Sequence, residues 1–144
     1  MTDDNLAIIV LAAGQGTRMK SATPKVLHQL AGAPIVAHVL ATARALDAAH
    51  VAVVVRHERD LVAAAVSAEL PGAVIVDQDE VPGTGRAVEL AVEALDGFDG
   101  EVLVLNGDVP LLNADTLTKF LDQHRTAGVA ASVLSAHFAD PAGY

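Results

Sequence analysis

The sequence contains no cysteine and no tryptophan, and aromatic residues make up 3% of its 144 residues. A chain without cysteine forms neither disulfides nor thiolate metal sites, which predicts a cytoplasmic protein. Because aromatic residues are so few, the core must be built from Val, Ile, Leu and Ala. Such a core is typical of proteins in which helices pack in layers on a sheet. No apolar run approaches the roughly 20 residues that cross a bilayer. The acidic start Met-Thr-Asp-Asp has the wrong charge for a secretory leader.

Acidic residues are missing from one long stretch of an otherwise acidic chain. The formal net charge of −9 argues against non-specific nucleic-acid binding, which requires neutralising many phosphates. Between Asp4 and Asp47 there is no carboxylate, although four Lys and Arg side chains lie there. Such a segment can concentrate a small polyanion. A chance gap in the acidic residues is the alternative explanation.

Five short apolar runs are nearly continuous rather than alternating, which is typical of strands buried on both faces. They are Leu6–Leu11, Val51–Val55, Ala73–Val76, Glu101–Leu105 and Val129–Leu134.

Helical patterns separate these runs. We expect one helix to begin at Pro34 and others to span Glu58–Leu70 and Thr84–Leu95. A fourth should begin at Asn113 or Asp115 and end at Ala127, before Gly128. Strands alternating with helices predict one α/β domain with a mainly parallel sheet, whose ligand lies beyond the carboxyl ends of the strands.

The segment after the first predicted strand, Leu11-Ala12-Ala13-Gly14-Gln15-Gly16-Thr17-Arg18-Met19-Lys20, is rich in small residues and cations. It contains no Walker A loop, and Met19 breaks the dinucleotide pattern G-x-G-x-x-G. Glycines allow backbone N–H groups to approach an oxyanion, and Arg18 and Lys25 can neutralise its charge. The segment therefore predicts a polyphosphate site, with a purely structural turn as the alternative.

Two further segments follow later predicted strands. Gln78 carries a donor and an acceptor, as reading a base edge requires, and Gly83-Thr84 open a helix whose free N–H groups favour oxygen-rich ligands. Asp108, in Asn106-Gly107-Asp108, is placed to hold Mg²⁺ on substrate oxygens. A helix cap and a turn are the structural alternatives. Three rival metal ligands are Asp77, Asp79 and Glu80. The six histidines lack zinc-site spacing.

With these segments together, the chain resembles the sugar-phosphate nucleotidylyltransferases. The resemblance is carried by L-A-A-G-Q-G-T-R-M-K-S-A-T-P-K-V-L-H-Q-L-A-G at 11–32 and runs from Ile8 to Tyr144. It points to the uridylyltransferase domain of bacterial bifunctional N-acetylglucosamine-1-phosphate uridylyltransferase/glucosamine-1-phosphate acetyltransferases. It implies a three-layer α/β/α Rossmann-like nucleotidyltransferase fold. It also implies synthesis of UDP-N-acetylglucosamine and pyrophosphate from UTP and N-acetylglucosamine 1-phosphate, a peptidoglycan precursor reaction.

The resemblance also implies roles for individual residues. Arg18 and Lys25 would grip phosphates, and Asp108 would bind the catalytic Mg²⁺. Gln78 would read uracil. The remaining nucleotide-binding positions would be Leu11, Ala12, Ala13, Gly14, Gly83, Thr84, Asn106 and Gly107. The family's usual G-T-G-H-A reads Gly83-Thr84-Gly85-Arg86-Ala87 here, so the role of position 86 is open.

By the same resemblance, residues 1–144 are the N-terminal nucleotide-binding portion of that domain. Later sugar-contacting residues and a β-helix acetyltransferase domain, on which the family's trimer is built, would lie beyond Tyr144. This portion alone is expected to bind nucleotide without full activity. The alternatives are a molybdenum-cofactor guanylyltransferase, a cytidylyltransferase acting on a sugar or polyol phosphate, or a non-catalytic nucleotide-binding module.

Overall fold

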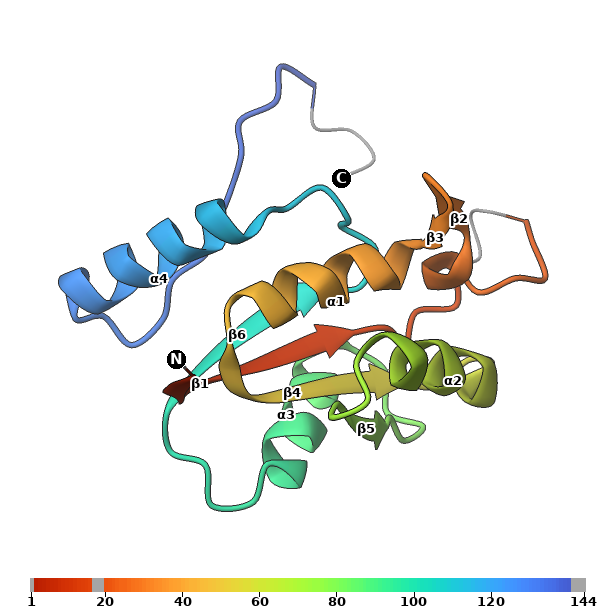
Figure 1. The fold of residues 1–144 in the computed structure, drawn as a ribbon, viewed down its shortest axis with the longest axis horizontal. Coiled ribbons are helices and arrows are strands. Elements are labelled where there is room, and N and C mark those ends of the chain that lie inside the picture. The colour runs from red at the N-terminus through yellow and green to blue at the C-terminus, as the bar shows by residue number, and fades with distance from the viewer. Residues whose placement is uncertain (1, 17–19, 141–144) are drawn as a thin grey trace. The chain divides into compact units, whose positions relative to one another are not determined.

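A computed structural model describes residues 2–16 and 20–140 of the chain. The chain divides into two compact units, Met1–Leu112 and Asn113–Tyr144. In the first unit, the four strands of the main sheet are β1 (Asp3–Leu11), β4 (Ala48–Val55), β5 (Val74–Asp77) and β6 (Glu101–Asn106). They are parallel and lie in the order β5-β4-β1-β6 (Figure 1). Four of the five predicted strands are confirmed.

Three helices connect these strands. They are α1 (Ile35–Ala45), α2 (Arg59–Glu69) and α3 (Thr84–Ala94). α1 and α2, which contact each other, lie on one face of the sheet and α3 lies on the other, against β1, β4 and β5 (Figure 1). β4 and β5 are added on one side of β1, whereas β6 is added on its other side. The switch in strand order therefore falls between β1 and β6. The predicted three-layer α/β/α arrangement is confirmed in this unit.

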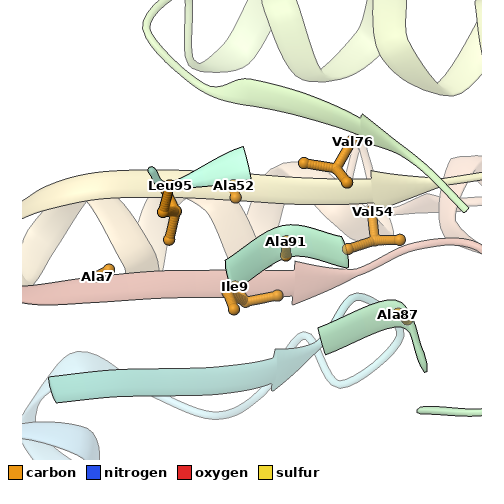
Figure 2. Packing of buried hydrophobic residues seen from close by; sticks show 8 residues of the cluster. All are labelled: Ala7, Ile9, Ala52, Val54, Val76, Ala87, Ala91 and Leu95. Atoms are coloured by element: carbon orange, nitrogen blue, oxygen red, sulfur yellow. The ribbon is translucent and has the colours of Figure 1, made fainter. Parts of the chain in front are cut away.

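Alternating side chains of the strands fill both faces of the sheet. Toward α3, Ile9 and Val54 pack with Ala87 and Ala91 of that helix, and Figure 2 shows the whole cluster. Alanines on α3 let the helix approach the sheet closely, which explains how so few large side chains close this layer. On the opposite face, Ile8, Val10, Val36, Val53, Val55 and Val62 are fully buried.

A short segment between β1 and α1 was not predicted as structured. It contains the 3₁₀ turn η2 (Lys25–Leu27) and a hairpin of β2 (Gln29–Leu30) and β3 (Ala33–Pro34). The hairpin turns at Ala31 and Gly32, which both have positive φ, as a two-residue turn of type I′ requires. Ala31-Gly32 is not one of the Asn-Gly, Asp-Gly or Gly-Gly pairs that usually mark such a turn in a sequence.

The second unit contains α4 (Ala114–Ala127), which agrees closely with the predicted fourth helix. The Asn113 side chain accepts a hydrogen bond from the Thr116 N–H at 2.9 Å, and Gly128 closes the helix in the left-handed conformation. None of the helices in the described part of the chain is long and apolar enough to cross a membrane.

The prediction of a fifth strand at Val129–Leu134 is wrong. Within residues 20–140 this run pairs with no strand, and Val133 is 86% exposed. A strand needs a neighbouring backbone to take up its N–H and C=O groups. A run of β-branched residues favours the extended conformation, but it does not show which strand, if any, would pair with it.

Candidate functional site: a cavity at the carboxyl edge of the sheet

A cavity of about 540 Å³ opens at the carboxyl ends of the parallel strands, as predicted. Residues following all four strands line it. The register brings these ends level, because Leu11 pairs with Val54 on one side and with Asn106 on the other. Segments about 95 residues apart in sequence thereby face one space.

The Gly-rich segment after β1 forms one wall. Leu11, Ala13 and Gly14 line the cavity, whereas the Ala12 side chain is buried and its N–H donates to the Val54 carbonyl. Gly16 has φ +61°, and a Cβ there would lie 2.8 Å from the Cβ of Lys25. Glycine at this position therefore lets the segment pass close to the lysine.

Arg18, predicted to grip phosphates, lies outside the described residues.

Lys25 and Asp108 meet in the cavity although 83 residues separate them in sequence. The Lys25 Nζ lies 2.7 Å from Asp108 Oδ2, and the two side chains are 41% and 36% exposed. Asn106 also lines the cavity. Gly107 does not, being buried with its N–H donating to the Leu11 carbonyl at 2.8 Å. The fold thus places the predicted phosphate-binding cation beside the predicted metal ligand.

Gln78 occupies the other end, after β5. Its Nε2 donates to the carbonyls of Val81 at 3.2 Å and Gly83 at 3.3 Å. Both amide hydrogens are therefore engaged within its own loop, and Oε1 remains as an acceptor. Gly83 and Thr84 line the cavity beside it, at the N-terminus of α3.

Arg86, at the position where the resembled family usually has histidine, forms ion pairs next to this loop. The Arg86 guanidinium contacts Asp79 Oδ2 at 2.6 and 2.8 Å and Glu89 Oε2 at 2.7 Å. The Arg86 hydrogen bond lowers the pKa of Asp79, and the pKa of Arg86 is raised in turn. Arg86 does not line the cavity. It ties the Gln78 loop to the first turns of α3, with Asp79 also accepting from the Val81 N–H.

The rival metal ligands are engaged elsewhere. Asp77 pairs with Arg59 at 2.8 Å, a contact that raises the pKa of that arginine, and Asp79 pairs with Arg86. Neither lines the cavity, and neither does Glu80. Asp108 is the one carboxylate in the described lining.

This donor set suits Mg²⁺ held partly by substrate. Residues 2–16 and 20–140 contain no cluster of three or more His, Asp or Glu side chains that could hold a metal ion by themselves. Mg²⁺ in phosphate-transfer sites takes one or two carboxylates and completes its octahedron with phosphate oxygens and water. Asp108, with Asn106 close by in sequence, fits that pattern.

Arg56 and His57, which follow β4, also line the cavity. Because they are the first residues after a buried strand, their position in the sequence predicts that they lie at the ligand-binding edge of the sheet, and the structure places them there. Neither belongs to a recognised motif, so the sequence predicts no role for either.

Solved structures share this architecture. Rv0371c from Mycobacterium tuberculosis H37Rv superimposes with a TM-score of 0.71 over 88% of this chain and 63% of that one, at 23% identity. A nucleotidyl transferase from Methanothermobacter thermautotroptrophicus gives 0.69 over 81% and 56%, also at 23% identity. The Rv0371c protein has also been solved as a complex with manganese. At these identities the likeness establishes the fold.

The sequence profile of the MobA-like NTP transferase domain matches residues 8–144. The chain belongs to this family. Among curated relatives of this NTP transferase domain, the Bifunctional protein GlmU of Leifsonia xyli subsp. xyli is 68% identical over the whole chain. The Bifunctional protein GlmU of Clavibacter sepedonicus is 59% identical over 96% of it. The chain spans 30% and 28% of the lengths of these two relatives.

Proposed function

We propose that this NTP transferase domain is the nucleotide-binding portion of a uridylyltransferase. The reaction joins UTP and N-acetylglucosamine 1-phosphate into UDP-N-acetylglucosamine and releases pyrophosphate. The observation that carries the proposal is one cavity with the Lys25–Asp108 pair at one end and the Gln78 acceptor at the other. The 68% identity to a bifunctional GlmU protein supports it.

The base would bind at the Gln78 end. Because both hydrogens of Nε2 are used by carbonyls of Val81 and Gly83, the amide offers Oε1 to a ligand. Uracil presents a donor at N3, whereas the N3 of cytosine is an acceptor and would face Oε1 unfavourably. This arrangement favours uridylyl over cytidylyl transfer.

The triphosphate would lie toward the Gly-rich segment and Lys25. The sugar phosphate is already ionised near pH 7, so its oxygen attacks the α-phosphorus without a general base. The bond from the α-phosphorus to the bridging oxygen breaks, and pyrophosphate leaves with that oxygen. Lys25 and backbone N–H groups hold the phosphates in line. When bound, Mg²⁺ on Asp108 would neutralise charge on the phosphate oxygens.

Calorimetry with the four ribonucleoside triphosphates in Mg²⁺ tests the proposal. We expect UTP to bind to this chain at least tenfold more tightly than CTP, GTP or ATP. A preference for CTP or GTP would instead favour the cytidylyltransferase or guanylyltransferase alternative. Equal binding of all four would contradict base reading by Gln78.

The metal role of Asp108 needs its own experiment. Asp108→Asn should weaken Mg²⁺-dependent UTP binding by at least tenfold. It should not weaken metal-free UTP binding, because Lys25 loses its competing carboxylate. Asp77→Asn is the matched control, since Asp77 also stands at the carboxyl end of a parallel strand of the sheet but pairs with Arg59 outside the cavity. Mg²⁺-dependent binding within threefold of wild type in Asp108→Asn would exclude the metal role.

Turnover separates binding from catalysis. We expect these 144 residues to bind UTP without full activity, as no described residue of the cavity is assigned to the sugar. Formation of UDP-N-acetylglucosamine from radiolabelled UTP by this chain, at rates typical of enzymes, would overturn that expectation.

A further inference from the structure

One cation of the cavity has no part in the proposed function. Arg56 is partly buried and lines the cavity. The other Lys or Arg in the described lining is Lys25, whose ammonium is held by Asp108 at 2.7 Å. Within residues 2–16 and 20–140, no hydrogen bond or ion pair engages the Arg56 guanidinium, which has only a longer-range electrostatic influence on Asp79.

Arg56 lies at the nucleoside end of the cavity. It follows β4, and the neighbouring β5 leads into Gln78, whose N–H donates to the carbonyl of Val55 at 2.9 Å. The Lys25–Asp108 pair belongs to the opposite side, around β1 and β6. Adjacent strands are about 4.8 Å apart. A nucleotide with its phosphates at β1 and β6 and its base on Gln78 must therefore pass Arg56.

The Gln78 amide leaves both carbonyl oxygens of uracil without a donor. Its Oε1 can accept the N3–H, but its two N–H groups are used within the loop. Uracil carries oxygens at positions 2 and 4, on either side of N3. The oxygen at position 2 is next to the glycosidic nitrogen and so faces the ribose. A residue between Gln78 and the phosphate end meets that oxygen first.

Building on the proposed uridylyltransferase function, we propose that Arg56 is a nucleotide-binding residue that donates a hydrogen bond to O2 of the uracil ring. Guanidinium has five N–H donors and no acceptor, so it suits a carbonyl oxygen. Its charge strengthens the bond relative to a neutral donor. Gln78 and Arg56 together then recognise an acceptor beside a donor on one edge of the base.

Analogues of UTP with sulfur at position 2 or position 4 test this contact, because sulfur is a weak hydrogen-bond acceptor. For the wild-type chain, 2-thio-UTP should bind about tenfold more weakly than UTP. UTP should bind to Arg56→Ala about tenfold more weakly than to wild type. To this variant, 2-thio-UTP should bind as tightly as UTP does. The 4-thio analogue should report no coupling to Arg56. The wild-type comparison does not depend on how well the variant folds.

Controls separate this role from a general charge effect. Arg44→Ala removes the same charge from an exposed site in the last turn of α1, outside the cavity, and should leave UTP binding unchanged. Pyrophosphate should bind equally to wild type and Arg56→Ala. Weaker pyrophosphate binding in that variant would place Arg56 on the phosphates and overturn the proposal. Coupling to 4-thio-UTP, or unchanged UTP binding in Arg56→Ala, would also overturn it.

The two proposals fail in different ways. If wild type prefers UTP while Arg56→Ala binds like wild type, only the Arg56 contact is wrong. If wild type shows no preference for UTP, the uridylyltransferase proposal fails, and the Arg56 contact fails with it.

Discussion

Replacing Gly107 with alanine should destabilise the protein through a collision of two backbones. A Cβ at this position would lie 2.7 Å from the Leu11 carbonyl oxygen and 3.4 Å from the Ala12 Cβ. The obstacle is main chain at the end of β1, so no flexible side chain can turn aside. The same carbonyl accepts the Gly107 N–H at 2.8 Å. Relieving the clash therefore also lengthens a buried hydrogen bond.

The magnitude follows from these two effects. Overpacking a close-packed site costs about 1–3 kcal/mol, and a weakened hydrogen bond costs up to about 1 kcal/mol. We expect Gly107→Ala to lower the free energy of unfolding by about 2 kcal/mol. For a chain of this size that corresponds to a fall in Tm of roughly 6 °C. Because Asp108 is the next residue, its distance to Lys25 should change too, and Mg²⁺-dependent UTP binding should weaken.

Urea unfolding followed by far-UV circular dichroism measures this change. Gly72→Ala is the matched control, because a Cβ there meets nothing within 4 Å and its φ is not positive. That variant should be as stable as wild type, or more stable by up to about 1 kcal/mol. A Gly107→Ala protein within 0.5 kcal/mol of wild type would refute the steric argument.

Two further predictions concern stability away from the catalytic chemistry. Asp79→Asn should lower the urea midpoint at pH 7, because Arg86 lowers the pKa of Asp79 in the folded state. The difference in midpoint between wild type and variant should be complete above about pH 4 and should disappear as the pH falls through the lowered pKa of Asp79. A midpoint difference that persists unchanged at pH 2 would rule out the ionic contribution. Asn113→Ala removes the bond to the Thr116 N–H and should cost α4 about 1 kcal/mol, whereas Asn113→Asp should retain the cap. Equal stability of these two variants would show that the cap is unimportant.

Local patterns predicted most of the elements. Pro71-Gly72 marked the end of α2, and Asn113 and Gly128 marked both ends of α4, because caps and turns depend on the conformations of a few adjacent residues. The same logic failed for Val129–Leu134, since a strand also needs a partner that local sequence does not name.

Some candidate site residues could be predicted from local sequence patterns, and others could not. The Gly-rich segment, Lys25, Gln78 and Asp108 were found from sequence, because each stands beside a turn or glycine pattern at the end of a strand. Arg56 was placed at the ligand-binding edge by its position after a strand, but nothing in Val55-Arg56-His57 predicts a role for it. The structure adds that Arg56 lines the cavity.

The sequence by itself determined the alternation of strands and helices, the likeness to nucleotidyltransferases and the residue types available for phosphate and base. The tertiary structure decided which charges meet. Lys25 pairs with Asp108 across 83 residues, while Asp79, a rival metal ligand in the sequence, pairs with Arg86. Ion pairs form over a few ångströms of space, and the parallel register of the sheet sets those distances. The spacing of residues along the chain does not.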